Sequence, residues 1–241
     1  MYQRILTTAL LVALTAPAAA GWDDADYTQK RELSIETQGL DRLMIDAGAG
    51  RLEVRGVDGS DRIVVDATIL VFGADGDRAL RYIEDEMRLT LEKNNGRAVL
   101  MAGFDSGMGF NNRSGAIQLE ISVPKGLELD IDKGSGETVI EGTAANIRID
   151  DGSGSLQIRD VGNLVVDDGS GSLRISDVSG DVEIDDGSGS IKVDRVTGSV
   201  TVDDGSGSVR VRDVGGDFIV IDDGSGSVNY SNVAGRVEID D

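Results

Sequence analysis

Aliphatic and polar residues alternate along most of this chain, in short triplets of the form apolar, polar, apolar. Because successive side chains of a β-strand point to opposite faces, such triplets predict strands with one buried face. The tripeptide Gly-Ser-Gly recurs at Gly134, Gly152, Gly169, Gly187, Gly205 and Gly224. Its spacings of 18, 17, 18, 18 and 19 residues predict a solenoid in which each unit forms one coil with two short strands.

Alignment of the units gives five columns of almost purely aliphatic residues that would stack inside the coils. The first strand supplies Leu156, Leu173, Ile191, Val209 and Val228, and then Ile158, Ile175, Val193, Val211 and Tyr230. The second strand supplies Ile147, Leu164, Val182, Val200, Ile219 and Val237, and then Ile149, Val166, Ile184, Val202, Ile221 and Ile239. The fifth column is Val161, Val178, Val196, Val214 and Val233. Rungs about 4.8 Å apart would bury these side chains, and each contributes roughly 1.5 to 3 kcal/mol.

The first half of the chain predicts a cap for one end of the solenoid. Residues 43–54 reproduce the repeat as a degenerate rung, which Val57, Ile63 and Val65 continue. A helix is expected after Asp75 or Asp77 as its N-cap, with an apolar stripe of Ala79, Leu80, Ile83 and Met87. Residues 88–93, 97–104 and 116–123 then predict strands. We therefore expect a small α/β cap with one helix over residues 21–126 and regular repeats over residues 127–241.

Several motifs carry a resemblance to a known family. The segment AIQLEISVPKG at residues 116–126 leads into LELDIDKGSGETVIEG, and runs of the SGDVEIDDGSGS kind follow. In these motifs the chain resembles a bacterial putative-adhesin family of unknown function, which is related to the head-GIN adhesin domains. The resemblance implies an exported β-solenoid with no agreed catalytic residue. The predicted fold is thus an all-β, parallel β-solenoid (β-helix) of two-strand coils, each about 18 residues long.

The N-terminus predicts export. Residues 1–20 contain a basic start at Arg4, an apolar run over residues 5–16 and the small residues Ala18, Ala19 and Ala20, as a cleaved signal peptide does. No later stretch approaches the roughly 20 apolar residues of a membrane-spanning helix. We expect a protein of the periplasm, the cell surface or the extracellular space, without a transmembrane segment.

Composition narrows the chemistry. The chain has no Cys and no His, which removes the usual zinc ligands, the Cys nucleophile and every Ser-His-Asp arrangement, so we do not expect an enzyme. The formal net charge is −21, which repels nucleic acid and attracts divalent cations and basic partners. The expected partner is an envelope protein or a glycan.

The hexapeptide DDGSGS starts at Asp150, Asp167, Asp185, Asp203 and Asp222 and has two interpretations. In the structural one, Gly supplies φ > 0 at a corner, Asp185 faces outward and Asp186 accepts a backbone amide. In the other, the stacked carboxylates bind Ca²⁺, because rows about 4.8 Å apart repel by about 3.5 kcal/mol per pair at an effective dielectric of 20. The candidate metal ligands are Asp150, Asp151, Asp167, Asp168, Asp185, Asp186, Asp203, Asp204, Asp222 and Asp223. We predict no other cofactor.

The outward positions of the two strands differ in sign. The first strand shows Gln157, Arg174, Lys192, Arg210 and Asn229, whereas the second shows Glu183, Thr201, Glu238 and the outer aspartates. The basic face is a candidate for a polar ligand such as a glycan, or for lateral contacts between copies. An irregular segment over residues 104–114 displays Phe104, Met108 and Phe110 and is a candidate binding loop. The last rung ends in Asp240 and Asp241, and its strand edge predicts self-association there.

These observations favour a non-catalytic binding or structural module, an adhesin or an envelope-associated scaffold. One alternative is a calcium-binding repeat protein. Another is a β-helix polysaccharide lyase or hydrolase, since paired carboxylates cleave glycosides. The same pair in every rung argues against this enzyme, because a catalytic pair needs one environment that separates two pKa values.

Overall fold

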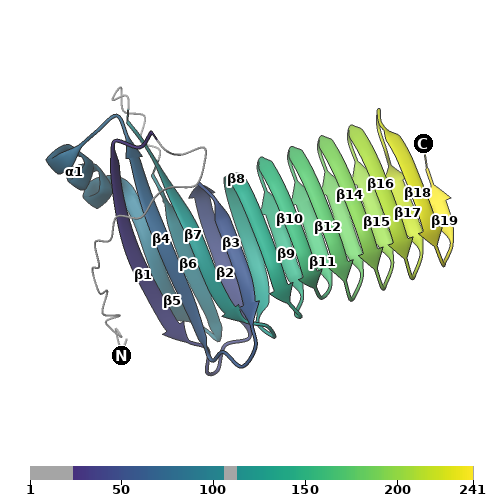
Figure 1. Ribbon diagram of the computed structural model, residues 1–241, viewed down its shortest axis with the longest axis horizontal. Helices are drawn as coiled ribbons and strands as arrows, with labels where there is room; N and C mark the ends of the chain where they lie inside the picture. The colour runs from purple at the N-terminus through teal and green to yellow at the C-terminus, as the bar shows by residue number, and fades with distance from the viewer. Residues whose placement is uncertain (1–23, 106–112, 241) are drawn as a thin grey trace.

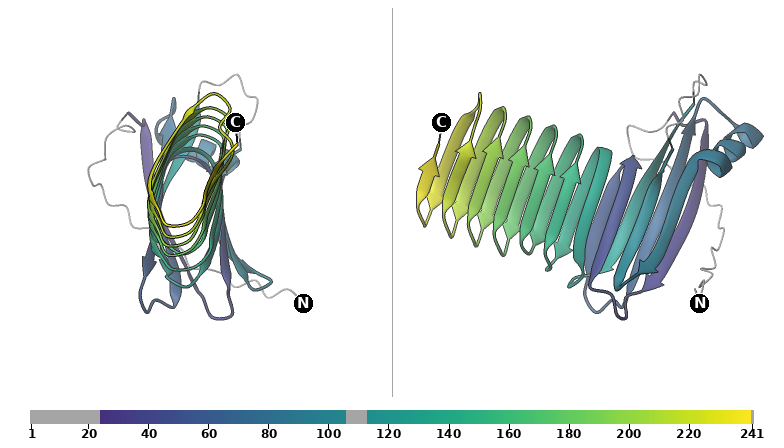
Figure 2. Two further views of the ribbon diagram at one scale, coloured as in Figure 1. Left: turned by 90° about the vertical axis from the view of Figure 1, so that its right-hand side faces the viewer. Right: turned by 180° about the vertical axis from the view of Figure 1, so that it is seen from behind.

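The repeats wind into a parallel β-solenoid, as the sequence predicted (Figure 1). The computed structural model describes residues 24–105 and 113–240, so the expected signal peptide, Met108, Phe110 and Asp241 lie outside the described residues. Each coil contributes one strand to each of two sheets, which enclose a flattened core (Figure 2). Neither described range contains a helix long and apolar enough to span a membrane.

Sheet A and sheet B meet in one long strand, β8 (Glu128–Thr143), which pairs in both. Beyond it, sheet A contains β10 (Gly154–Val161), β12 (Gly171–Val178), β14 (Gly189–Val196), β16 (Gly207–Val214) and β18 (Ser227–Val233). Sheet B contains β9 (Ile147–Asp151), β11 (Leu164–Asp168), β13 (Val182–Asp186), β15 (Val200–Asp204), β17 (Phe218–Asp222) and β19 (Val237–Ile239). Like residues meet in register, as Leu173 does with Ile191 and Asp168 with Asp186.

The N-terminal part extends both sheets. Its elements are β1 (Tyr27–Glu36), β2 (Arg42–Ala49), β3 (Leu52–Val57), β4 (Arg62–Phe72), α1 (Gly76–Glu86), β5 (Met87–Asn94), β6 (Arg97–Phe104) and β7 (Ser114–Pro124). Strands β2 and β3 form the predicted rung and stack in parallel on β8. In sheet A, β7 pairs in parallel with β3, and β4 and then β1 extend the sheet as antiparallel strands. In sheet B, β6 pairs in parallel with β2, and β5 pairs antiparallel with β6. One hydrophobic core continues through both parts, from Leu43 to Val220.

Three expectations for the N-terminal part were wrong. Ile63 and Val65 do not continue the rung, because they lie in β4 and pair antiparallel with β1 and β7. In α1, Ala79 and Ile83 are buried as expected, but Leu80 is 39% exposed. Asp75 occupies the N-cap position without a side-chain capping bond, since its carboxylate accepts from the Arg78 guanidinium at 2.6 Å.

Two expected core columns are out of register in β17. Phe218 and Val220 are the buried residues there, and they pair with Val200 and Val202. Ile219 instead pairs with outward Thr201, and Ile221 is 53% exposed. The physical reason is that the repeat unit containing β17 is one residue longer than its neighbours. The register between β15 and β17 shifts by one residue after Val202, which pairs with Val220, whereas Asp203 pairs with Asp222. Residues of β17 that are counted back from the aspartate pair are therefore assigned to the wrong face.

The last rung is less covered than the others. Tyr230 and Ile239 belong to core columns, yet they are 50% and 37% exposed, and Tyr230 lies against Phe218 with ring centroids 5.8 Å apart. Among the described residues, β18 and β19 each pair on one side only. Self-association through this rung stays a prediction.

The two kinds of corner use different backbone solutions. After sheet B, glycines adopt the left-handed conformation, for example Gly189 at φ 153°. A Cβ atom there would lie 1.9 Å from the carbonyl oxygen of Gly171 on the rung below, so no larger residue fits. At the other corner the positive φ falls on non-glycine residues, namely Asp160, Asp177, Arg195, Asp213 and Asn232.

Candidate functional site

The two aspartates of each repeat lie on opposite sides of sheet B. Asp185 is exposed, whereas Asp186 is 1% exposed and points to the same side as Ile184. We call the exposed or half-exposed set the outer row: Asp150, Asp167, Asp185, Asp203 and Asp222. We call the buried set the inner row: Asp151, Asp168, Asp186 and Asp204. The structure thus places nine of the ten predicted metal ligands, all but Asp223, in two rows instead of bringing each pair together.

Three of the four inner-row aspartates accept one hydrogen bond each, and all four leave oxygen atoms unpaired. Asp168, Asp186 and Asp204 each accept, through Oδ1, the backbone amide two residues later, at 3.1 to 3.2 Å. This confirms the expected corner acceptor. The Oδ2 atoms of these three residues and both carboxylate oxygens of Asp151 are buried without a hydrogen-bond partner.

The fifth aspartate pair departs from this pattern. The shift in β17 leaves Asp223 half-exposed, and it is Asp222 that accepts a corner amide, from Gly224 at 2.8 Å. The inner row therefore ends at Asp204, and the next aspartate of the file, Asp223, is half-exposed.

Burial governs the electrostatics of the inner row. Desolvation and, after it, the neighbouring carboxylate of Asp168 raise the pKa of Asp151 and of Asp186 to about 6. Desolvation also raises the pKa of Asp168 and of Asp204. These shifts mean that the folded chain holds the ionised inner row at a cost in free energy.

Lys133 continues the inner row on the rung below Asp151, and the sequence analysis did not single it out. Its Nζ donates to the carbonyl oxygen of Gly48 at 2.6 Å and to that of Ser135, and burial lowers its pKa to about 8. The signal was available, because IDKGSG in β8 aligns with IDDGSG in the repeats and puts Lys133 where the second aspartate stands.

The predicted sign difference between the outer faces is present. On sheet A, Gln157, Arg174, Lys192, Arg210 and Asn229 stand in register, one per rung. Lys192 forms an ion pair with Asp194 at 3.1 Å. Within the described ranges, Arg174 and Arg210 have no hydrogen-bond or ion-pair partner. A row of serines runs beside them: Ser155, Ser172, Ser190, Ser208 and Ser227.

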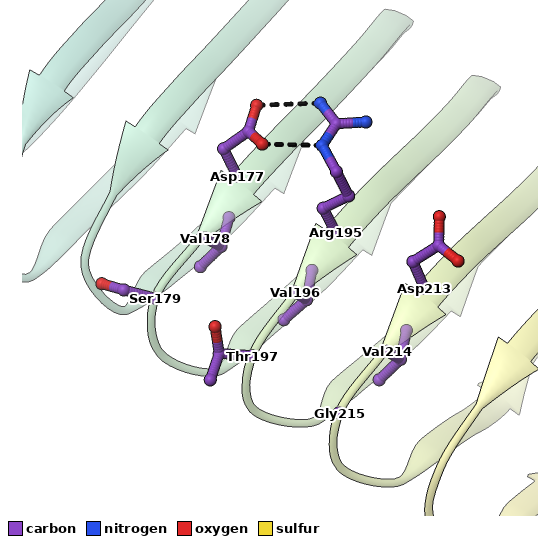
Figure 3. A pocket seen from close by; sticks show the side chains of 9 residues that line it. All are labelled: Asp177, Val178, Ser179, Arg195, Val196, Thr197, Asp213, Val214 and Gly215. Atoms are coloured by element: carbon purple, nitrogen blue, oxygen red, sulfur yellow. Dashed lines mark hydrogen bonds and ion pairs between the residues drawn. The ribbon is translucent and has the colours of Figure 1, made fainter.

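A shallow groove of about 520 Å³ follows the corner that leaves sheet A (Figure 3). Arg195 and Asp177 face each other there in a two-pronged ion pair of 2.7 and 2.8 Å. This pair lowers the pKa of Asp177 and raises that of Arg195. Asp213 accepts instead from the Asn232 amide at 2.8 Å. The charges of the groove are therefore satisfied within the chain.

In residues 24–105 and 113–240, no three Asp, Glu, His or Cys side chains converge so as to hold one ion.

Phe104, from the expected binding loop, packs on Tyr82 with ring centroids 5.2 Å apart.

Comparison with known proteins identifies the family. The Toastrack DUF4097 family model matches residues 72–240, which is more than half of the chain. The chain belongs to this family. No curated protein matches this Toastrack chain.

Solved structures resemble the Toastrack chain at low identity. A putative adhesin from Bacteroides fragilis is 13% identical, with 90% of this chain and 99% of that chain covered and a TM-score of 0.42. A putative lipid binding protein from Parabacteroides distasonis is 16% identical, with 89% and 97% covered and a TM-score of 0.40. A putative cell adhesion protein from Clostridium sporogenes is 13% identical, with 88% and 99% covered and a TM-score of 0.31. At this similarity the matches carry no functional argument.

Proposed function

We propose that this Toastrack chain is an exported, non-catalytic binding module that holds an acidic polysaccharide of the cell envelope against the outer face of sheet A. The observation that carries the proposal is the in-register row around Arg174, Lys192 and Arg210. Successive rungs place these cations about 4.8 Å apart on a rigid surface. A polymer with repeated anionic groups can engage several of them at once, which raises its avidity without further contacts.

The composition of this face supports a charged and hydroxylated ligand. The serine row offers hydroxyl groups that donate and accept hydrogen bonds beside the cations. On the outward positions of β10 to β18, no aromatic side chain is present for stacking on a sugar ring. Recognition would therefore rest on ionic and polar contacts with carboxylate, sulfate or phosphate groups of the polymer.

The strongly acidic net charge does not prevent such binding. At physiological ionic strength the Debye length is about 8 Å, and the two sheets pack about 10 Å apart. A ligand on sheet A is therefore screened from most of the outer row on sheet B. It interacts mainly with the basic row beneath it.

The lyase or hydrolase alternative finds no support in the geometry. Asp185 and Asp186 lie on opposite sides of one strand, so this pair cannot flank one glycosidic bond. A buried carboxylate such as Asp186 cannot reach a polymer outside the coil. The proposal therefore assigns the aspartates no catalytic role.

The test is binding of the purified chain to immobilised polygalacturonate, with neutral dextran as the reference, in 0.15 M salt. We expect binding to polygalacturonate only, and an affinity at least about tenfold weaker for the double variant R174Q/R210Q. Arg148, an exposed arginine on the outer face of sheet B, provides a control for the loss of a positive charge elsewhere, and R148Q should bind within about twofold of the unsubstituted chain.

Three results would overturn the proposal. One is the absence of polygalacturonate binding, and another is equal weakening by R174Q/R210Q and R148Q. The third is release of unsaturated products or reducing ends from the polymer, which would instead support the enzyme.

A further inference from the structure

The inner row contains buried carboxylate oxygens that the chain itself leaves unpaired. Asp151, Asp168, Asp186 and Asp204 are at most 1% exposed, and each carries at least one oxygen without a hydrogen-bond partner. They face one another directly, because Asp168 pairs in register with Asp151 and with Asp186, and Asp186 with Asp204. A buried, unpaired anion is unfavourable unless another group compensates it, so four in one file indicate a missing partner.

The described part of the chain supplies too little positive charge to be that partner. Lys133 lies beside Asp151 at one end of the row, and its ammonium already donates to two backbone carbonyls. The charged groups that act on Asp168, Asp186 and Asp204 are other aspartates. One ammonium against four carboxylates leaves a net negative file inside the coil.

The corner itself does not require a carboxylate. An Asn at the position of Asp186 could accept the Ser188 amide in the same way and donate its own amide to the next rung. The chain uses such a stack elsewhere, since Asn163 donates to Asn146 on the preceding rung at 2.9 Å. The repeated aspartate therefore adds a charge that the turn does not need.

We propose that the inner row binds Ca²⁺ between consecutive rungs, with one carboxylate oxygen from each rung. Rungs are about 4.8 Å apart, so an ion midway between two of these oxygens lies about 2.4 Å from each, within the 2.3 to 2.6 Å of calcium–oxygen bonds. Mg²⁺ binds oxygen at about 2.0 to 2.1 Å and needs near-ideal octahedral geometry, which this spacing does not provide. Calcium also accepts carbonyl and water oxygens in a flexible shell, so the side chains need supply only part of it.

The half-exposed Asp223 at the end of the row marks the route that we infer for the ion. Asp223 is half-exposed after the register shift and lies close enough to Asp204 to raise its pKa. An ion attracted to the acidic surface would enter past Asp223 and reach Asp204 first.

The experiment compares two matched triple variants. D168N/D186N/D204N neutralises three inner aspartates, and D167N/D185N/D203N neutralises three outer aspartates on the same strands, so both change the net charge equally. The purified chain and both variants are stripped with chelator at pH 7.5. Their Tm is then measured in CaCl₂, MgCl₂ and NaCl of equal ionic strength, and calcium binding is measured by titration calorimetry.

We expect CaCl₂ at one hundred times Kd to raise the Tm of the unsubstituted chain by about 5 to 10 °C more than NaCl does, and MgCl₂ to do less. The outer variant should keep this shift, and the inner variant should fold and lose it. The single variant D186N should weaken it and is a second test if the triple variant does not fold. Equal shifts in CaCl₂ and NaCl would overturn the proposal, as would loss of the calcium shift in the outer variant alone.

Discussion

Substitution D186N tests whether the inner row costs the fold stability at neutral pH. Burial raises the pKa of Asp186 to about 6, against about 3.9 for an exposed aspartate. A difference of about two units corresponds to about 3 kcal/mol between the two protonation states. Asn keeps the shape of the side chain and can still accept the Ser188 amide, but it carries no charge.

The sign of the effect follows from proton linkage. Between about pH 4 and pH 6 the folded chain holds a proton on Asp186 that the unfolded chain has released. The folded state is therefore free of the cost of a buried Asp186 charge below about pH 4, and this advantage is lost as the pH rises through 6. We expect D186N to be more stable than the unsubstituted chain by up to about 3 kcal/mol at pH 7.5, and equally stable near pH 4.

Urea unfolding followed by far-ultraviolet circular dichroism at pH 4, 5, 6 and 7.5, with chelator present, measures this difference. Carboxylates with lowered pKa values, such as Glu128 and Asp177, act in the opposite direction, but they are common to both proteins and cancel. Exposed Asp185 provides the control, and D185N should change stability by less than about 0.5 kcal/mol. A D186N chain that is less stable at pH 7.5, or whose advantage does not depend on pH, would refute the reasoning.

Two further substitutions test the corner and the register. G189A should destabilise the chain by more than about 2 kcal/mol in urea unfolding, because its Cβ would overlap the Gly171 carbonyl, and a loss below 0.5 kcal/mol would contradict the close approach. F218A should cost about 3 to 5 kcal/mol, whereas I221A should stay within about 0.5 kcal/mol. A larger loss of stability in I221A than in F218A would instead support the register that the sequence predicted, with Ile221 in the core.

The repeats were predictable because every rung has the same alternation of apolar and polar residues. A strand that places Ile184 inward must place Asp186 inward as well, two residues later, so the inner row was implicit in the alternation. The failure at β17 has the same origin. Counting back from the aspartate pair assumes a constant unit, and the stretch FIVI offers apolar residues on both faces, so the pattern could not locate the extra residue.

The N-terminal part was less predictable because strand partners are not encoded locally. Strand β1 (YTQKRELSIE) was missed, since its side chains are half-buried or exposed and it lacks a clear apolar face. Ile63 and Val65 have the same local rhythm in β4 as the rung residues have, yet they pair antiparallel. Charge compensation beside Asp151 was within reach of the sequence, because IDKGSG in β8 aligns with the IDDGSG repeats and puts Lys133 in the inner row.

Three perturbations act on the same atoms in the inner row. Acid adds a proton to Asp186, Asn removes its charge, and a cation between the rungs would neutralise it. Because each removes the same desolvated charge, their stabilising effects should not add: D186N has less to gain from acid, and an inner row of asparagines has nothing to gain from calcium. The outer row behaves differently, since its charges are solvated and respond to any salt. The two aspartates of each corner should thus respond differently to salt. The stability effect of the inner row should depend on which cation is present, whereas that of the outer row should depend only on ionic strength.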